Sequence, residues 1–70
     1  VRMKLKQVKR YVQNRIEGIE GAISVHQSVI DFDNPCEEEL KYRQGAIEEL
    51  MVDLDVYRYY LTCLNTKGEQ

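Results

Sequence analysis

The residues of this sequence that could do chemistry are few: one histidine, His26, two cysteines, Cys36 and Cys63, and several clustered glutamates. A catalytic histidine needs a nucleophile or an orienting carboxylate that converges on it, and no spacing here identifies either. On one continuous helix the two cysteines would lie about 40 Å apart, too far for a disulfide and too far for both to join His26 at one metal ion. We therefore expect no catalytic site, no metal site and no cofactor.

The glutamates have a structural explanation. Glu37 with Lys41, and Glu39 with Arg43, are spaced four residues apart in the order that favours ion pairs on an exposed helix face. Di-metal helix bundles present a Glu-x-x-His motif to their core, and this sequence lacks that motif. These patterns indicate a protein that is not an enzyme.

The strongest break in the chain is Asn34-Pro35-Cys36-Glu37. Asparagine is a preferred N-cap residue, proline is favoured at the first helical position, and Glu37 would then complete a capping box. The short polar segment before the break is typical of a turn. The sequence thus predicts an all-α antiparallel two-helix hairpin in a single domain of residues 1–70, with helices at about 2–32 and 35–64, a turn at 31–34 and a tail at 65–70.

Apolar residues repeat in both halves with the spacing of helices that pack against each other. In the second half they follow an a/d heptad pattern that only Arg43 interrupts, at Leu40, Ile47, Leu50, Leu54, Tyr57, Leu61 and Leu64. In the first half the steps are of three and four, with one extra step of four that acts as a stutter. The members there are Leu5, Val8, Val12, Ile16, Ile19, Ile23, His26 and Ile30. These two stripes predict the seam between the helices.

A hairpin that turns near residue 33 pairs residues whose numbers sum to about 67 or 68. This register places His26 opposite Lys41 or Tyr42, as a hydrogen-bonded histidine in the core or at its boundary.

The same register sets Gly21 and Ala22 against Gly45 and Ala46. Glycine inside a helix is about 1 kcal/mol less favourable than alanine, so a pair of glycines at one crossing point predicts close approach of the two backbones. Two alternatives stay open: Gly18 and Gly21 bend the first helix, or they split it to give a three-helix arrangement.

The second helix carries a further apolar stripe, formed by Val52, Val56, Tyr59, Tyr60 and Cys63. The first helix is widened in the same way by Val1, Met3, Tyr11, Val25, Val29 and Phe32. One hairpin cannot cover this surface, so we expect two hairpins to dock as a homodimer and form a four-helix bundle. A different protein partner and a stable monomer are the alternatives.

Charge is unevenly distributed, although the net charge is only -2. Residues 1–16 contain six Lys or Arg and no acid, whereas residues 17–70 contain four Lys or Arg and twelve Asp or Glu. One explanation is compensation by Asp53 and Asp55, which the register places near residues 12–15, and by carboxylates of a partner chain. The other is contact with nucleic acid through the basic residues Arg2, Lys4, Lys6, Lys9 and Arg10, since clustered cations bind phosphate without any sequence-reading motif.

Uninterrupted apolar runs are only a few residues long, so we expect no membrane span and no signal peptide. Two cysteines that cannot pair indicate a reduced, cytoplasmic protein. The sequence as a whole favours a small interaction or regulatory module that self-associates and binds a larger protein. The alternative is a nucleic-acid-binding accessory or transcription-regulatory protein that uses the basic segment.

Overall fold

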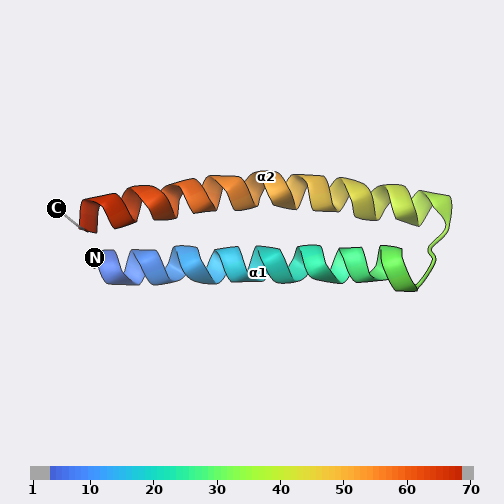
Figure 1. Ribbon diagram of the computed structural model, residues 1–70, viewed down its shortest axis with the longest axis horizontal. Coiled ribbons are helices and arrows are strands. Elements are labelled where there is room, and N and C mark those ends of the chain that lie inside the picture. Colours follow the sequence, from blue (N-terminus) through green and yellow to red (C-terminus); the bar gives the residue numbers. More distant parts are fainter. Residues whose placement is uncertain (1–3, 69–70) are drawn as a thin grey trace.

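The computed structural model describes residues 4–68, with side chains as far as residue 66. It contains two long helices that lie side by side, α1 at Leu5–Phe32 and α2 at Glu37–Gly68 (Figure 1). The start of α1 and the end of α2 lie together at one end of the molecule, which we call the open end. The connection lies at the other, the turn end. The predicted all-α antiparallel hairpin is therefore confirmed.

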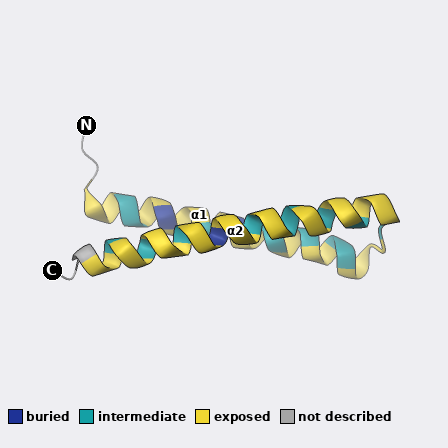
Figure 2. Ribbon diagram, turned by 90° about the horizontal axis from the view of Figure 1, so that it is seen from above, coloured by how far each residue is buried: buried dark blue, intermediate teal, exposed yellow. Residues whose placement is uncertain are grey.

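The predicted seam forms the core. Val12 and Ile19 of α1 are each 5% exposed and Leu54 of α2 is 7% exposed. The remaining seam residues of α2 are half-buried, as are those of α1 except Leu5, which is exposed. Figure 2 shows how small this core is, because most of both ribbons is exposed, and half-buried and a few buried bands recur between the exposed stretches. No side chain in the described part of the chain is completely buried.

The turn differs from the prediction. Helix α1 continues through Phe32, and the backbone N–H of Asp33 donates to the carbonyl oxygen of Val29 at 3.0 Å. Asn34 then adopts a left-handed conformation with φ of 47°, which makes it the residue that follows the C-cap of α1. The N–H of Leu40 donates to the carbonyl oxygen of Cys36 at 2.8 Å. Cys36, and not Asn34, is therefore the N-cap of α2.

The outer ends of the helices also lie elsewhere than expected. Lys4 is extended, with ψ of 149°, and its N–H donates to Oε1 of Gln7 at 3.0 Å, so α1 begins at Leu5 rather than near residue 2. Helix α2 passes Leu64 and continues to Gly68, through most of the predicted tail. The hydroxyl of Thr66 donates to the carbonyl oxygen of Thr62 at 3.0 Å within this last turn. Helical hydrogen bonds thus extend beyond the last apolar residue of the seam.

The glycines do not mark a close approach of the backbones. A Cβ atom placed on Gly18, Gly21 or Gly45 would meet nothing within 4 Å. Gly21 and Gly45 are exposed on the outer surfaces of their helices. Helix α1 is continuous through Gly18 and Gly21, so the split into three helices is also wrong.

Candidate interaction surface

The two sides of the hairpin that flank the seam differ in chemistry. One of them, the polar side, carries an ion pair between the helices, with Nη2 of Arg58 at 3.2 Å from Oε2 of Glu20. Along α1 on this side, Nε2 of Gln27 donates to Oδ1 of Asp31 at 3.0 Å. A shallow groove between the helices is lined by these polar groups and also by Ile23, Met51 and Leu54.

The opposite side, which we call the apolar side, carries most of the large exposed hydrophobic residues. At about 100° of rotation per residue, those that lie across the seam from Glu20 and Arg58 are Tyr11, Val25 and Phe32 of α1 and Tyr42, Val56 and Tyr60 of α2. Their exposed fractions run from 43% for Val56 to 82% for Phe32. The exposed polar residues Asn14, Glu49 and Asp53 lie among them. Six of the ten large exposed hydrophobic residues thus lie on one side of the hairpin.

The five residues predicted as an interface are all exposed, but they form two groups. Val56, Tyr60 and Cys63 belong to the apolar side, since Cys63 follows Val56 by one heptad, whereas Val52 and Tyr59 lie on the back of α2, farthest from α1. The groups meet where the rings of Tyr59 and Tyr60 lie 6.5 Å apart. A side-chain hydrogen bond with Cys63, and then the charge of its thiolate, raise the pKa of Tyr59.

Tyr42 is the member of the apolar side that the sequence analysis missed. It is 67% exposed and lies near the turn end. A signal was present, because Tyr42 precedes Val56 by two full heptads and therefore lies on the same face of α2. The predicted stripe began only at Val52, since Glu49 interrupts the apolar pattern before it.

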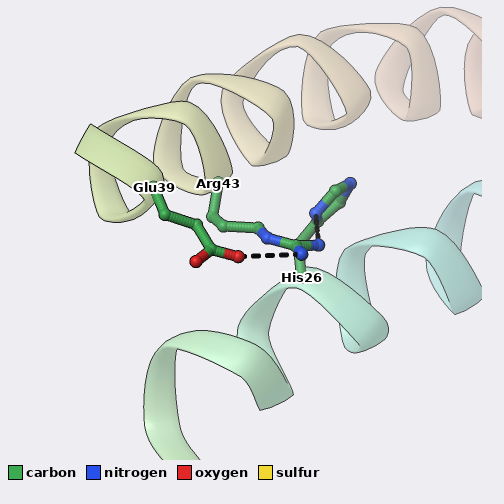
Figure 3. A network of polar contacts seen from close by, with 3 residues as sticks. All are labelled: His26, Glu39 and Arg43. Atoms are coloured by element: carbon green, nitrogen blue, oxygen red, sulfur yellow. Dashed lines mark hydrogen bonds and ion pairs between the residues drawn. The ribbon is translucent and has the colours of Figure 1, made fainter. Parts of the chain in front are cut away.

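His26 contributes to a polar layer within the seam (Figure 3). Nη1 of Arg43 lies 3.0 Å from Nδ1 of His26, and Nη2 of Arg43 lies 3.2 Å from Oε1 of Glu39. Arginine only donates hydrogen bonds, so Nδ1 must accept and the neutral ring carries its proton on Nε2. The ring also meets Tyr42 edge to face at 6.3 Å between centroids. The predicted hydrogen-bonded boundary histidine is confirmed, with Arg43 as its partner and Tyr42 beside it.

The basic residues of the predicted nucleic-acid contact lie at the open end. Lys4, Lys6 and Arg10 are exposed and Lys9 is half-buried, while Arg2 lies outside the described residues. Within residues 4–66 none of these four side chains forms an ion pair with an acid. The compensation expected from Asp53 and Asp55 is therefore not an ion pair.

Arg15, the last cation of the basic segment, contacts an aromatic ring. Its guanidinium carbon lies 5.6 Å from the centroid of Tyr57 in α2, a cation–π contact. A side-chain hydrogen bond with Tyr57 is the main cause that raises the pKa of Arg15, and the charge of Asp53 makes the smallest contribution. The seam thus has aromatic and polar layers towards both of its ends.

Within the described part of the chain, no cluster of three His, Cys, Asp or Glu residues could hold a metal ion. None of the described helices has the length and apolar character needed to cross a membrane. The chain matches no protein-family model, no curated protein and no solved structure in the comparisons made.

Proposed function

We propose that this protein is a non-enzymatic interaction module that self-associates through its apolar side into a four-helix bundle and then binds a larger protein. The observation that carries the proposal is the concentration of exposed hydrophobic residues on one side of the hairpin. Exposed hydrophobic residues that gather on one side of a soluble protein mark interaction sites.

The small core of the hairpin supports the same proposal. Only Val12, Ile19 and Leu54 are buried hydrophobic residues in the described chain. Chains of this length need a further source of stability, such as disulfides, a metal or a partner. Both cysteines are free, so a second hairpin is the source that the described surface favours. Two exposed free thiols also suit a reducing compartment, and a cytoplasmic location is part of the proposal.

Sedimentation equilibrium at micromolar concentration tests the self-association. We expect a dimer mass, and a dimer that weakens when Tyr60 is changed to Ala. Gln13→Ala is a matched control, because Gln13 is exposed and forms no side-chain hydrogen bond in the described chain. A monomer mass with full helix content would contradict the proposal.

The larger partner is proposed from the back of α2. Val52 is 64% exposed and Tyr59 is 60% exposed, and a hairpin docked on the apolar side would leave both in water. Tyrosine is enriched among the residues that contribute most to protein interfaces. This second surface therefore provides an anchor for a protein other than the second hairpin.

Tyr59→Ala tests this second surface. We expect it to abolish capture of the partner from the source cells while leaving helix content and dimer mass unchanged, whereas Thr62→Ala would retain capture. Equal capture by Tyr59→Ala and the unmodified protein would contradict a role for the back of α2.

Nucleic-acid binding is the second candidate function. It is favoured by Lys6, Lys9 and Arg10, which follow one another at helical spacing near the start of α1 and form no ion pair with a described acid. Fluorescence anisotropy with short duplex and single-stranded probes at two salt concentrations is the direct test. Binding that weakens with salt, and that is lost when Lys4, Lys6, Lys9 and Arg10 are changed to Ala, would support it. No binding at low salt would exclude it.

A further inference from the structure

The two ends of the hairpin carry opposite charge. Residues 31–49 form the turn end and contain seven acidic and two basic residues. In the described part of the open end, residues 4–15 of α1 contain five cations and no acid, and the facing part of α2, residues 53–66, adds Asp53, Asp55 and Arg58, so this end keeps a net positive charge. The molecule is 50 Å long, so the outermost members of the two clusters are separated by several screening lengths at physiological salt.

Neither cluster is neutralised within the described chain. Both bases of the turn end pair with glutamates of their own helix, Lys41 with Glu37 at 3.7 Å and Arg43 with Glu39 at 3.2 Å. Five carboxylates remain without an ion pair to a described cation, namely Asp31, Asp33, Glu38, Glu48 and Glu49. The five open-end cations, Lys4, Lys6, Lys9, Arg10 and Arg15, likewise have no ion pair to a described acid.

Two identical hairpins can dock side by side with twofold symmetry in two ways. If the symmetry axis runs along the hairpins, the acidic ends meet each other and the basic ends meet each other. If the axis is perpendicular to them, each acidic turn end lies beside the basic open end of the partner. Like charges brought together are unfavourable and opposite charges are favourable, so charge selects the second arrangement.

We propose that the occupant of the apolar side is a second copy of this chain docked antiparallel, with its turn end beside the open end of the first. This inference rests on the self-association proposed above and adds the orientation of the two copies. The basic open end is then the complement of an acidic surface of the partner copy.

The two cysteines allow this orientation to be measured. Both are exposed, with Cys36 at the turn end and Cys63 about 40 Å away along α2. An antiparallel dimer brings Cys36 of one copy level with Cys63 of the other. A parallel dimer brings each cysteine level with its own counterpart.

The experiment uses Cys36→Ser and Cys63→Ser, each of which retains one cysteine, and a bismaleimide with a flexible six-carbon spacer. Each variant is treated alone and after the two have been unfolded and refolded together. We expect the mixture to give about tenfold more cross-linked dimer than either variant alone, because only the mixed dimer holds its two thiols at high effective concentration. Sedimentation equilibrium of both variants reports whether the dimer itself forms.

The outcomes separate the two proposals. A dimer mass together with cross-linking of each variant alone would overturn the antiparallel orientation and leave the self-association intact. A dimer mass without cross-linking in the mixture would overturn the orientation too. A monomer mass for the unmodified chain would overturn the self-association and the orientation with it.

Discussion

Leu54 and Val56 lie two residues apart on the same helix, yet Leu54 is 7% exposed and Val56 is 43% exposed. Leu54 belongs to the seam and packs against α1, whereas Val56 belongs to the apolar side, where the described chain covers side chains only in part. The difference teaches that each helix carries two adjacent apolar surfaces, and that folding of a single hairpin uses only one of them. Stability of the hairpin and association of two hairpins should therefore respond to different substitutions.

The largest effect should come from the seam. Leu54→Ala removes a nearly buried side chain, and we expect a loss of about 2 to 4 kcal/mol in the free energy of unfolding. In a core this small that loss should also lower helix content at room temperature. Urea denaturation followed by circular dichroism, at one fixed protein concentration, measures it.

Val52→Ala is the matched control on the outer surface of the same turn. Its side chain is 64% exposed, so we expect a change of less than about 0.5 kcal/mol. Equal losses from Leu54→Ala and Val52→Ala would contradict the separation between the seam and the outer surfaces.

The next effect should appear in association and not in folding. Tyr60→Ala removes an aromatic ring that is 53% exposed on the apolar side. We expect the dimer dissociation constant to rise about tenfold to thirtyfold, which corresponds to about 1 to 2 kcal/mol at an interface anchor. Sedimentation across a concentration series measures it. An unchanged constant would remove Tyr60 from the interface and favour another surface.

The seam and the apolar side also differ in how far the sequence could predict them. Heptad spacing on one helix was enough to place Leu54 in the core. To place Tyr42 and Phe32 on one side of the molecule, one must know how each helix is oriented about its own axis. The ion pair between Glu20 and Arg58 reveals this orientation. The apolar side is formed by the two helices together, so periodicity within one helix cannot predict it.

The turn and the glycines show a second limit. Asparagine is favoured both at an N-cap and in the left-handed conformation after a helix, so residue type alone does not decide which helix Asn34 serves. Glycine within a helix is equally ambiguous, because it occurs both where two backbones are in close contact and where the helix surface is open. Only the empty space beside Gly21 and Gly45 decides between them.

That empty space gives a stabilising prediction. Gly21→Ala and Gly45→Ala should each stabilise the hairpin by about 1 kcal/mol, because alanine is the better helix former and its Cβ atom meets nothing within 4 Å. Thermal denaturation measures the gain. A loss of stability that appears only at concentrations where the dimer forms would show that a second copy approaches these glycines, and would move the interface to the outer surfaces of the helices.

The smallest effect should come from the polar side. Glu20 and Arg58 form the ion pair between the helices, but their side chains are 49% and 55% exposed, so water and salt screen the attraction. A double-mutant cycle with Glu20→Gln and Arg58→Gln should give a coupling of about 0.2 to 1 kcal/mol that declines at high salt. A coupling above about 2 kcal/mol that survives high salt would require the pair to be buried. The polar side would then be covered in the assembled protein, and it, rather than the apolar side, would be the docking surface.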